Sequence, residues 1–294
     1  MENYPEPARR IVAQMWAAAE ADPDRAVAFQ GAPGANSHRA LGEHFPDALP
    51  LPCFSFEDAL EAVKEGKAGH AIIPIENSVH GRVADIHFLL PESGLAIVGE
   101  HFLPIVPALI GKAGHQIREV MSHPQALGQS RKWLRARGIR PIDYADTAAA
   151  VAAVEEMKDW SIAAIAPAFA ADIYGLDVIE NEIADEAHNT TRFLILAREE
   201  RRPADGPVMT TFIFEVNNIP AALYKALGCF ATNGINMTKL ESYQRGASFA
   251  ATEFFTDIEG APGDPAVDRA LEELRFQARS VRILGTYRQA RKRG

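Results

Sequence analysis

The sequence is poor in cysteine and has no long apolar run. Its 294 residues include 2 cysteines, Cys53 and Cys229, and neither belongs to a CxxC pair. Isolated cysteines supply neither a disulfide framework nor a zinc site, so we expect both side chains to be buried as small apolar groups. No segment reaches the ~20 apolar residues of a membrane-spanning helix, and residues 1–24 lack the apolar core of a secretory signal. We therefore expect a soluble, cytoplasmic protein without a membrane partner.

The chain also has no excess of positive charge. The chain has 30 Lys and Arg against 39 Asp and Glu, a formal net charge of −9. Non-specific nucleic-acid binding needs a dominant positive field, so we expect no nucleic-acid partner. The basic segment 289–294 is interpreted as a solvated tail. A small anionic substrate is still compatible with an acidic chain, because a single pocket can be locally cationic.

Motifs for the common cofactors are absent. The segment Phe29–Ser37 contains glycines but fits neither GxGxxG nor GxxxxGK, the dinucleotide and P-loop patterns. No set of His, Cys and Glu residues has metal-ligand spacing, and there is no GxSxG elbow. The sequence therefore predicts no metal and no cofactor, and it disfavours zinc and serine hydrolases.

The chain does contain enough apolar residues for a sizeable core. Hydrophobic residues make up 47% and charged residues 23%, as in ordinary globular proteins. The length suggests about two domains. Segment 198–208 is charged, contains prolines and glycine and has no apolar periodicity, so we interpret it as a linker.

Before this linker, short apolar runs alternate with helix-period segments. The helical segments are Phe56–Lys64, Pro124–Arg137 and Thr147–Met157. The apolar runs are interpreted as strands: Ala26–Phe29, Ala71–Pro74, Leu95–Val98, Ile105–Ile110, Val120–Ser122, Ile162–Ala166 and Phe193–Leu196. This alternation predicts an α/β fold with parallel sheets, arranged as two lobes around a cleft. Residues 1–25 are expected to be a peripheral extension with a short helix near residues 9–20.

After the linker, the pattern changes to strand, helix, strand, strand, helix, strand. The predicted elements are Thr210–Val216, Ile219–Thr232, Ile235–Tyr243, Ser248–Asp257, Pro265–Ala278 and Ser280–Tyr287, with a hairpin turn at 244–247. This βαββαβ order is ferredoxin-like. The segment shows no catalytic constellation, and by analogy with similar modules it is expected to sense a ligand.

Polar residues gather where predicted strands end. Glu76, Asn77 and Ser78 follow one strand, and the helix starting at Pro124, which carries Gln125, follows another. Ligands of open α/β sheets bind at such carboxyl ends. The glycine turn before the helix Ser37–Phe45, with Asn36 or Ser37 as cap, offers N–H groups to an anion. For each motif an ordinary capped turn is the alternative.

Three further positions carry candidate chemistry. His123 is either a general acid or base or a loop residue that only satisfies a hydrogen bond. Asp146 and Thr147 begin a helix after an extended segment. The segment Asn189–Phe193 supplies a hydroxyl and a guanidinium that suit a carboxylate.

Taken in order, the motifs PIENSxxG, SHPQALxQ, DTA and NxTRF resemble those of the prephenate dehydratase family. The resemblance runs from about Ala26 to Leu196, and the segment after the linker resembles an ACT regulatory domain. It implies a two-lobed catalytic domain of the type II periplasmic-binding-protein fold over residues 26–197. One lobe would comprise about 26–103 and 184–197, and the other about 104–183. The ACT domain would cover residues 209–288.

The resemblance also implies a reaction. Prephenate would lose its ring carboxylate as CO2 and its ring hydroxyl as water, giving phenylpyruvate for phenylalanine biosynthesis without a metal or cofactor. Thr191 would stand beside the leaving hydroxyl, and Glu76 and Asn77 would orient it. The implied substrate-binding residues are Ser37, Ser78, Ser122, Gln125, Gln129, Thr147, Asn189, Arg192 and Phe193.

Feedback regulation by phenylalanine, in a homodimer or homotetramer, is a further implication. The family builds its phenylalanine site from PGAL and ESRP segments, and this chain has Ile219–Leu223 and Leu240–Gln244 at those places. Ala221 replaces the glycine, and Tyr243-Gln244 replaces Arg-Pro. The extra methyl of Ala221, where the backbone would approach the ligand, is expected to weaken phenylalanine binding. The implied effector residues are Asn217, Pro220, Ala221, Ala222, Leu223, Glu241 and Ser242.

Two alternatives remain open at this stage. One is arogenate dehydratase, which acts on the amino counterpart of prephenate. The other is a non-catalytic sensor of amino acids or other solutes, which the intact NxTRF segment disfavours. A fused chorismate mutase is not expected, because about 25 residues before the first strand are too few for its helical domain.

Overall fold

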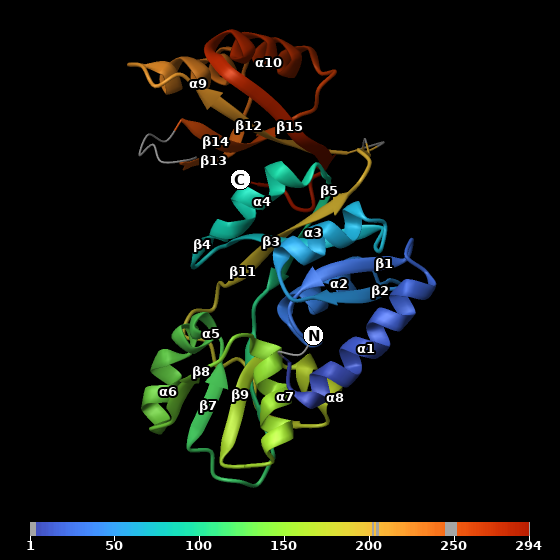
Figure 1. Ribbon diagram of the computed structural model, residues 1–294. Coiled ribbons are helices and arrows are strands. Elements are labelled where there is room, and N and C mark those ends of the chain that lie inside the picture. Colours follow the sequence, from blue (N-terminus) through green and yellow to red (C-terminus); the bar gives the residue numbers. More distant parts are fainter. Residues whose placement is uncertain (1–3, 202, 204–205, 245–251, 294) are drawn as a thin grey trace. The chain divides into compact units, whose positions relative to one another are not determined.

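The computed structural model describes residues 4–201, 203, 206–244 and 252–293 (Figure 1). The chain divides into two compact units. The first contains Met1–Leu89 and His101–Phe193, and the second contains Leu90–Glu100 and Leu194–Gly294. Along the chain, the two units meet inside strands β5 (Ala96–Pro104) and β11 (Thr190–Ala197). The second unit therefore includes residues 90–100 and 194–197 in addition to the expected regulatory segment.

One lobe of the first unit is built on the sheet β2-β1-β3-β11-β5. Strand β1 (Ala26–Gln30) pairs in parallel with β2 (Leu49–Cys53) and β3 (His70–Asn77), and the short β4 (Gly81–Arg82) pairs with β3. Three helices follow these strands: α2 (Asn36–His44), α3 (Phe56–Lys64) and α4 (Ala84–Ser93).

The other lobe is built on the sheet β10-β6-β9-β7-β8. Its strands are β6 (Pro107–Gly111), β7 (Glu119–Ser122), β8 (Arg140–Asp143), β9 (Ile162–Pro167) and β10 (Asp177–Glu180). Its helices are α5 (Pro124–Gln129), α6 (Arg131–Arg137), α7 (Thr147–Met157) and α8 (Phe169–Tyr174). The two sheets share one strand order. In the first, β1 lies between β2 and β3, and β11 lies beside β3. In the second, β7 lies between β8 and β9, and β6 lies beside β9; β11 and β6 are the strands at which the chain enters each sheet from the other lobe. The catalytic region thus has the predicted type II periplasmic-binding-protein fold.

Local sequence explains where several helices begin and end. Ser55 and Asp58 form a reciprocal capping box at the start of α3, and Asp146 accepts a hydrogen bond from the Ala149 N–H at the start of α7. Both helices coincide with their predicted ranges. The predicted helix Pro124–Arg137 is wrong in one respect: it breaks at Ser130, whose φ of −115° is not helical.

Helix α1 (Glu6–Ala21) is longer and less peripheral than the sequence suggested. Apolar residues at helical spacing bury one face, including Ala8, Val12 and Ala19, each at most 1% exposed. Ala8 and Val12 belong to the core cluster around α7, and the Trp16 indole donates a 2.9 Å hydrogen bond to the Pro52 carbonyl of β2. Helix α1 therefore packs against elements of both lobes, α7 in one and β2 in the other.

The second unit contains a four-stranded sheet of order β13-β14-β12-β15. Its elements are β12 (Val208–Val216), α9 (Ala222–Thr232), β13 (Met237–Tyr243), β14 (Glu253–Glu259), α10 (Pro265–Gln277) and β15 (Ala278–Arg288). Both helices cover one face of this sheet (Figure 1), around a core that includes Phe212, Phe214 and Phe230. The βαββαβ order and the strand order are ferredoxin-like, as predicted. The expected hairpin turn at 244–247 lies largely outside the described residues.

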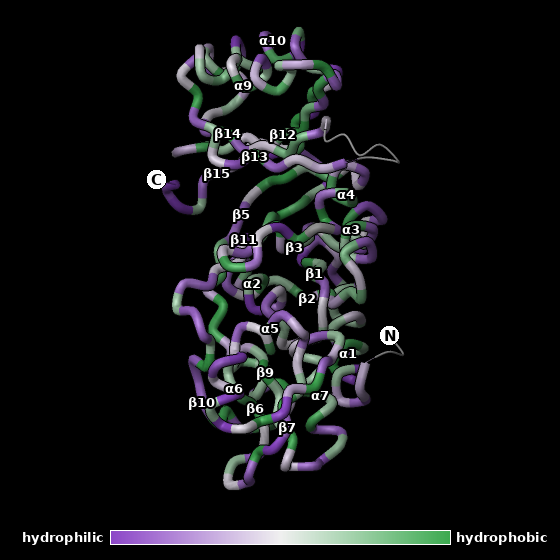
Figure 2. The backbone as a smooth tube through the Cα atoms, turned by 90° about the vertical axis from the view of Figure 1, so that its left-hand side faces the viewer, coloured by the Kyte–Doolittle hydropathy of each residue, from purple (hydrophilic) through white to green (hydrophobic). Residues whose placement is uncertain are grey.

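The C-terminal tail is bound rather than solvated, so that expectation was wrong. Residues 291–293 of the tail are hydrophilic (Figure 2), yet Arg293 forms ion pairs with Glu100 and Asp257, whose side chains are fully buried. The Ala290 N–H also donates to Glu100 at 3.0 Å. The two buried carboxylates need a cation, and the tail supplies it.

In the described part of the chain, no helix is long and apolar enough to cross a membrane. Cys53 and Cys229 are both buried and unbridged, as expected.

Candidate active site

A cavity of about 360 Å³ lies between the two lobes of the first unit. Seven of the predicted site residues line it: Ser37, Asn77, Gln125, Gln129, Thr147, Thr191 and Phe193. They come from the starts of α2 and α7, from both ends of α5, from the end of β3 and from the first half of β11. The cavity therefore gathers segments that lie more than 150 residues apart along the chain, including the strand end and the helix starts where the sequence placed a ligand.

Asn77 and Thr191 form the centre of a hydrogen-bond network. The Asn77 Oδ1 accepts from the backbone N–H groups of Val79 and His80, at 2.9 and 3.0 Å. These donors turn the amide NH2 toward the neighbouring strand, where it donates to Thr191 Oγ1 at 2.9 Å and to Asn189 Oδ1 at 2.6 Å. Because Thr191 accepts this bond, its own hydrogen is left to donate elsewhere.

Arg192 and Glu76 do not line this cavity. Side chains alternate along a strand, so Arg192 points away from the face that carries Thr191 and Phe193. Arg192 is buried and pairs with Glu76 at 2.9 Å. The structure brings these two predicted site residues together, beside the cavity rather than in it.

Three other predicted residues lie near the cavity or behind it. Ser78 exchanges hydrogen bonds with the backbone of His188 and Thr190, both at 2.9 Å. Ser122 is fully buried and donates to the Ile165 carbonyl at 2.6 Å. Asn189 lines a neighbouring pocket, and its Oδ1 accepts from Asn77. All three hold loops and strands in place around the cavity.

The glycine turn before α2 packs against the other lobe instead of lying open. A Cβ on Gly34 would come within 2.9 Å of the Ala170 Cβ, and a Cβ on Gly31 within 3.1 Å of Asp146 Oδ2. The Tyr174 hydroxyl donates to the Pro33 carbonyl at 2.7 Å. Glycine is required here because the two lobes approach closely, and both glycines have positive φ.

Helix α2 itself still presents N–H groups to the cavity. Ala35 occupies the N-cap position and no side chain caps the helix, so the predicted capping by Asn36 or Ser37 is wrong. Ala35, Asn36 and Ser37 all line the cavity. An uncapped first turn carries unpaired N–H donors and the positive end of the helix dipole, which suit a carboxylate.

Asp146 and His123 are the titratable residues among those that line the cavity. Burial raises the pKa of the Asp146 carboxyl, and hydrogen bonds from the N–H groups of Ala149, Ala148 and Ala32 oppose that rise. His123 is the N-cap of α5, and its Nδ1 accepts from the Gln125 N–H at 3.2 Å. A neutral His123 ring therefore carries its hydrogen on Nε2.

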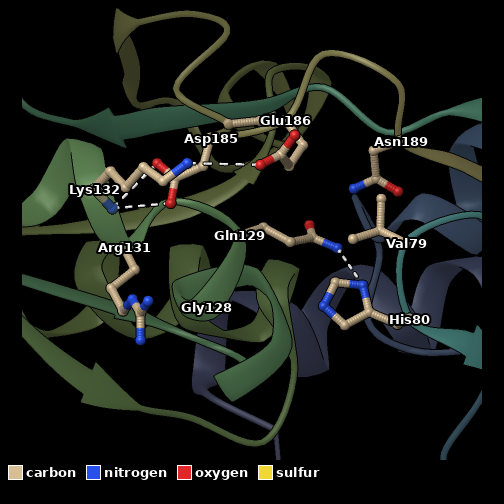
Figure 3. A pocket seen from close by; sticks show the side chains of 10 residues that line it. Val79, His80, Gly128, Gln129, Arg131, Lys132, Asp185, Glu186 and Asn189 are labelled. Atoms are coloured by element: carbon tan, nitrogen blue, oxygen red, sulfur yellow. Dashed lines mark hydrogen bonds and ion pairs between the residues drawn. The ribbon is translucent and has the colours of Figure 1, made fainter.

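A smaller pocket of about 260 Å³ adjoins the cavity (Figure 3). Gln129 lines both spaces, and it contacts His80, with 3.1 Å between Gln129 Nε2 and His80 Nδ1. The pocket also contains Arg131 and Lys132. Opposite them lies Asp185, whose carboxylate accepts from the Lys132 N–H at 2.9 Å. The negative charge of Asp185 thus partly offsets the positive charges of Arg131 and Lys132 near the cavity.

Within the described residues, no cluster of three or more His, Cys, Asp or Glu side chains could hold a metal ion.

The expected effector residues lie in the second unit. Asn217 and Pro220–Leu223 form the turn from β12 into α9, where Ala221 has a left-handed φ of 63°. Glu241 and Ser242 belong to β13, the edge strand of the sheet.

Sequence reasoning did not select several lining residues, among them Gln30, Phe56 and Ile105. Gln30 is the last residue of β1, so the strand-end rule that selected Asn77 could also have found it. Phe56 and Ile105 carry no distinguishing local signal, because only the folded chain brings them to the cavity.

Comparisons with known proteins agree with this architecture. The prephenate dehydratase family model matches residues 27–201. A protein of Komagataeibacter europaeus, named bifunctional N-acyl-homoserine lactone acylase/prephenate dehydratase, is 45% identical and covers 90% of this chain and 96% of its own. Arogenate dehydratase/prephenate dehydratase 1 of Arabidopsis thaliana is 38% identical, covering 89% of this chain and 71% of its own.

Among solved structures, the prephenate dehydratase of Arthrobacter aurescens in complex with L-Phe is similar. Its TM-score is 0.80 at 30% identity, and the match covers 90% of each chain. The match of the family model to more than half of the sequence and the shared fold lead to one conclusion. The chain belongs to the prephenate dehydratase family and is a carbon–oxygen lyase.

Proposed function

We propose that this enzyme converts prephenate into phenylpyruvate, CO2 and water. The bond between the ring and its carboxylate breaks, its electron pair completes the aromatic ring, and the ring hydroxyl leaves. The departing hydroxide takes up one proton and becomes water. An enzyme for this step must hold a dianion and stabilise negative charge on the leaving oxygen.

The hydrogen bond from Asn77 to Thr191 carries this proposal. It occupies an acceptor position of the threonine oxygen, so the Thr191 O–H hydrogen is directed to the cavity. A threonine is a poor Brønsted acid. Thr191 therefore acts as a fixed hydrogen-bond donor to the leaving hydroxyl. It stabilises the leaving oxygen by its position and does not transfer its own proton.

The N–H groups at the start of α2 are proposed to bind a substrate carboxylate. They line the cavity without a side-chain cap, and the helix dipole adds favourable potential. Phe193, on the same strand face as Thr191, contributes apolar surface for the ring. The Glu76–Arg192 pair holds β3 and β11 in register from behind, rather than touching the substrate.

His123 is proposed as a second hydrogen-bond donor to the leaving hydroxyl. Because its Nδ1 accepts from Gln125, its Nε2–H can donate into the cavity, and solvent supplies the proton that turns the departing hydroxide into water. Asp146 is less suited, since its carboxylate is already engaged by three backbone N–H groups.

We further propose that residues 209–288 form an ACT domain that senses phenylalanine. The ferredoxin-like topology and the L-Phe complex of the Arthrobacter relative support this assignment. Phenylalanine would bind near Pro220–Leu223 and Glu241-Ser242, between paired copies in a dimer or tetramer. The effector must favour one state of the enzyme, so turnover should change with millimolar phenylalanine.

The test is phenylpyruvate formation from prephenate at neutral pH, measured as enol absorbance in alkali. Heat-inactivated enzyme is the control, because acid alone drives this reaction. Turnover proportional to enzyme concentration supports the proposal, and its absence from folded protein contradicts it. The same assay with and without phenylalanine tests the regulatory part.

Arogenate is the second candidate substrate, since the Arabidopsis relative carries both activities in its name. Comparing kcat/KM for prephenate and arogenate decides between them. The acylase activity named for the Komagataeibacter relative finds less support here. Acyl transfer needs a nucleophile that is activated by a base. The Thr191 hydroxyl instead accepts a hydrogen bond from the Asn77 side-chain amide, which is not a base. A cytoplasmic location is proposed to match this biosynthetic role.

A further inference from the structure

The segment that joins β3 to β4 contacts the other lobe. His80 lies in this segment, and its ring points toward Gln129 at the end of α5 (Figure 3). Gln129 Nε2 and His80 Nδ1 are 3.1 Å apart. Because Gln129 lines both the cavity and the adjoining pocket, this contact lies at the mouth between the two spaces.

The same ring nitrogen has a second neighbour. His80 Nδ1 lies 3.2 Å from Asn77 Oδ1, the atom whose bonds orient the amide toward Thr191. The two neighbours need opposite states of the nitrogen. The Gln129 amide N–H requires a bare Nδ1 that accepts, whereas the Asn77 oxygen requires an Nδ1–H that donates. His80 can therefore satisfy one neighbour at a time.

We propose that His80 is a positioning residue that closes the mouth of the active-site cavity, an inference that rests on the proposed dehydratase function. In the closed arrangement, neutral His80 with its hydrogen on Nε2 accepts from Gln129 and holds the two lobes together at this point. In the open arrangement, Nδ1–H turns to Asn77, and Gln129 is released.

This arrangement fixes what His80 must supply: an acceptor at the δ position of the side chain. Asparagine places its Oδ1 the same number of bonds from Cα as histidine Nδ1, but its oxygen cannot donate. The His80→Asn variant should therefore keep the closed contact, and the His80→Ala variant should lose it. Loss of one such hydrogen bond corresponds to about 3- to 10-fold in kcat/KM.

The experiment measures kcat and KM for prephenate in wild type and in the variants His80→Ala, His80→Asn, Gln129→Ala and His80→Ala/Gln129→Ala. Arg131→Ala is the matched control, because Arg131 lines the same pocket and Figure 3 draws no hydrogen bond from it to His80 or Gln129. We expect kcat/KM to fall about 3- to 10-fold in His80→Ala and to recover within about 2-fold in His80→Asn. In the double variant, kcat/KM should fall by a smaller factor than the product of the factors measured for the two single variants. Thermal unfolding should be unchanged, since His80 is exposed.

An active wild type in which His80→Ala matches Arg131→Ala overturns the role of His80 and leaves the proposed function intact. Independent, multiplicative losses at His80 and Gln129 also overturn it. A folded wild type that turns over neither prephenate nor arogenate overturns the proposed function, and this inference with it.

Discussion

At the scale of single residues, the orientation of one amide decides what the neighbouring hydroxyl can do. Two backbone N–H groups hold the Asn77 oxygen, so its NH2 group must face Thr191. A Thr191→Ala substitution removes the donor to the leaving hydroxyl, and we expect kcat to fall by about 10²-fold or more. Steady-state assays of phenylpyruvate formation measure this loss. Thr191→Ser, which keeps the hydroxyl, should retain most of the activity, and near-normal turnover in Thr191→Ala would exclude this role.

His38 gives a second prediction, on stability. Its ring stacks on Phe29, meets Phe169 edge-on and accepts the Gly34 N–H at 3.1 Å, and burial lowers its pKa from 6.5 to about 4. Below pH 6.5 the unfolded chain takes up a proton that the folded chain refuses until about pH 4. The free energy of unfolding should therefore fall as the pH drops through this window, by up to about 1.4 kcal/mol per pH unit from this group.

Urea unfolding at several pH values between 7 and 4 measures this dependence. His38→Phe keeps an aromatic ring but cannot titrate, so its stability should fall less steeply than that of wild type. Substitution of the exposed His115 by Asn is the matched control. Equal slopes for wild type and His38→Phe would exclude His38 as the cause.

At the scale of single elements, the start of α9 is strained. Ala221 has a φ of 63°, a left-handed conformation that costs a residue with a Cβ about 1–2 kcal/mol. Glycine avoids this cost but loses about 0.5–1 kcal/mol through the entropy of the unfolded chain. The strain is the larger effect, and glycine is also the better N-cap residue. Ala221→Gly should raise the free energy of unfolding by about 0.5–1 kcal/mol.

Chemical denaturation checks this value, with Ala231→Gly as the control. Ala231 is exposed in the same helix with ordinary helical geometry, so glycine there should lower stability by about 1 kcal/mol. Destabilisation by both substitutions would contradict the strain argument. If phenylalanine binds at this turn, Ala221→Gly should also strengthen its effect on turnover.

The elements differ in how far the sequence could predict them. Helices α3 and α7 were predicted to the residue because capping side chains and apolar periodicity agree there. Strand β2 was missed because Pro50 and Pro52 argue against a strand. Among the described strands, β2 pairs only with β1 at the sheet edge, where prolines need not donate to a neighbour.

The candidate site follows the same division. Asn77, Thr191 and Phe193 could be predicted, because strand ends and family motifs mark them. The ion pair between Glu76 and Arg192, beside the cavity, could not be predicted, because it depends on which strand face each side chain occupies. The contact between Gln129 and His80 joins residues 49 positions apart, and no local pattern encodes it.

At the scale of the whole molecule, each end of the chain completes the core of one unit. Helix α1 packs on both lobes of the first unit, and the tail pairs with Glu100 and Asp257 in the second. These contacts join segments far apart along the chain, so local composition suggested two peripheral ends instead.

The tail contact carries a prediction. Arg293→Ala leaves two buried carboxylates without this cation, and we expect it to lower the free energy of unfolding by about 3 kcal/mol. Lys292→Ala, a neighbouring and exposed change of the same charge, should have little effect. Differential scanning calorimetry compares the two variants with wild type. Similar melting of all three proteins would show that the tail contributes nothing to stability.

The position of α1 also has a consequence for biosynthesis. Helix α1 leaves the ribosome before α7, yet the Glu6 N–H donates to the Glu156 carboxylate of α7, 150 residues later. At ~5–20 residues per second, that partner follows roughly 8–30 s afterwards. Throughout that interval the two lobes that cover the apolar face around Val12 are not yet complete, so the nascent chain offers chaperones a binding segment at α1. Synthesis order, rather than the final fold, then sets when this enzyme is most exposed to aggregation.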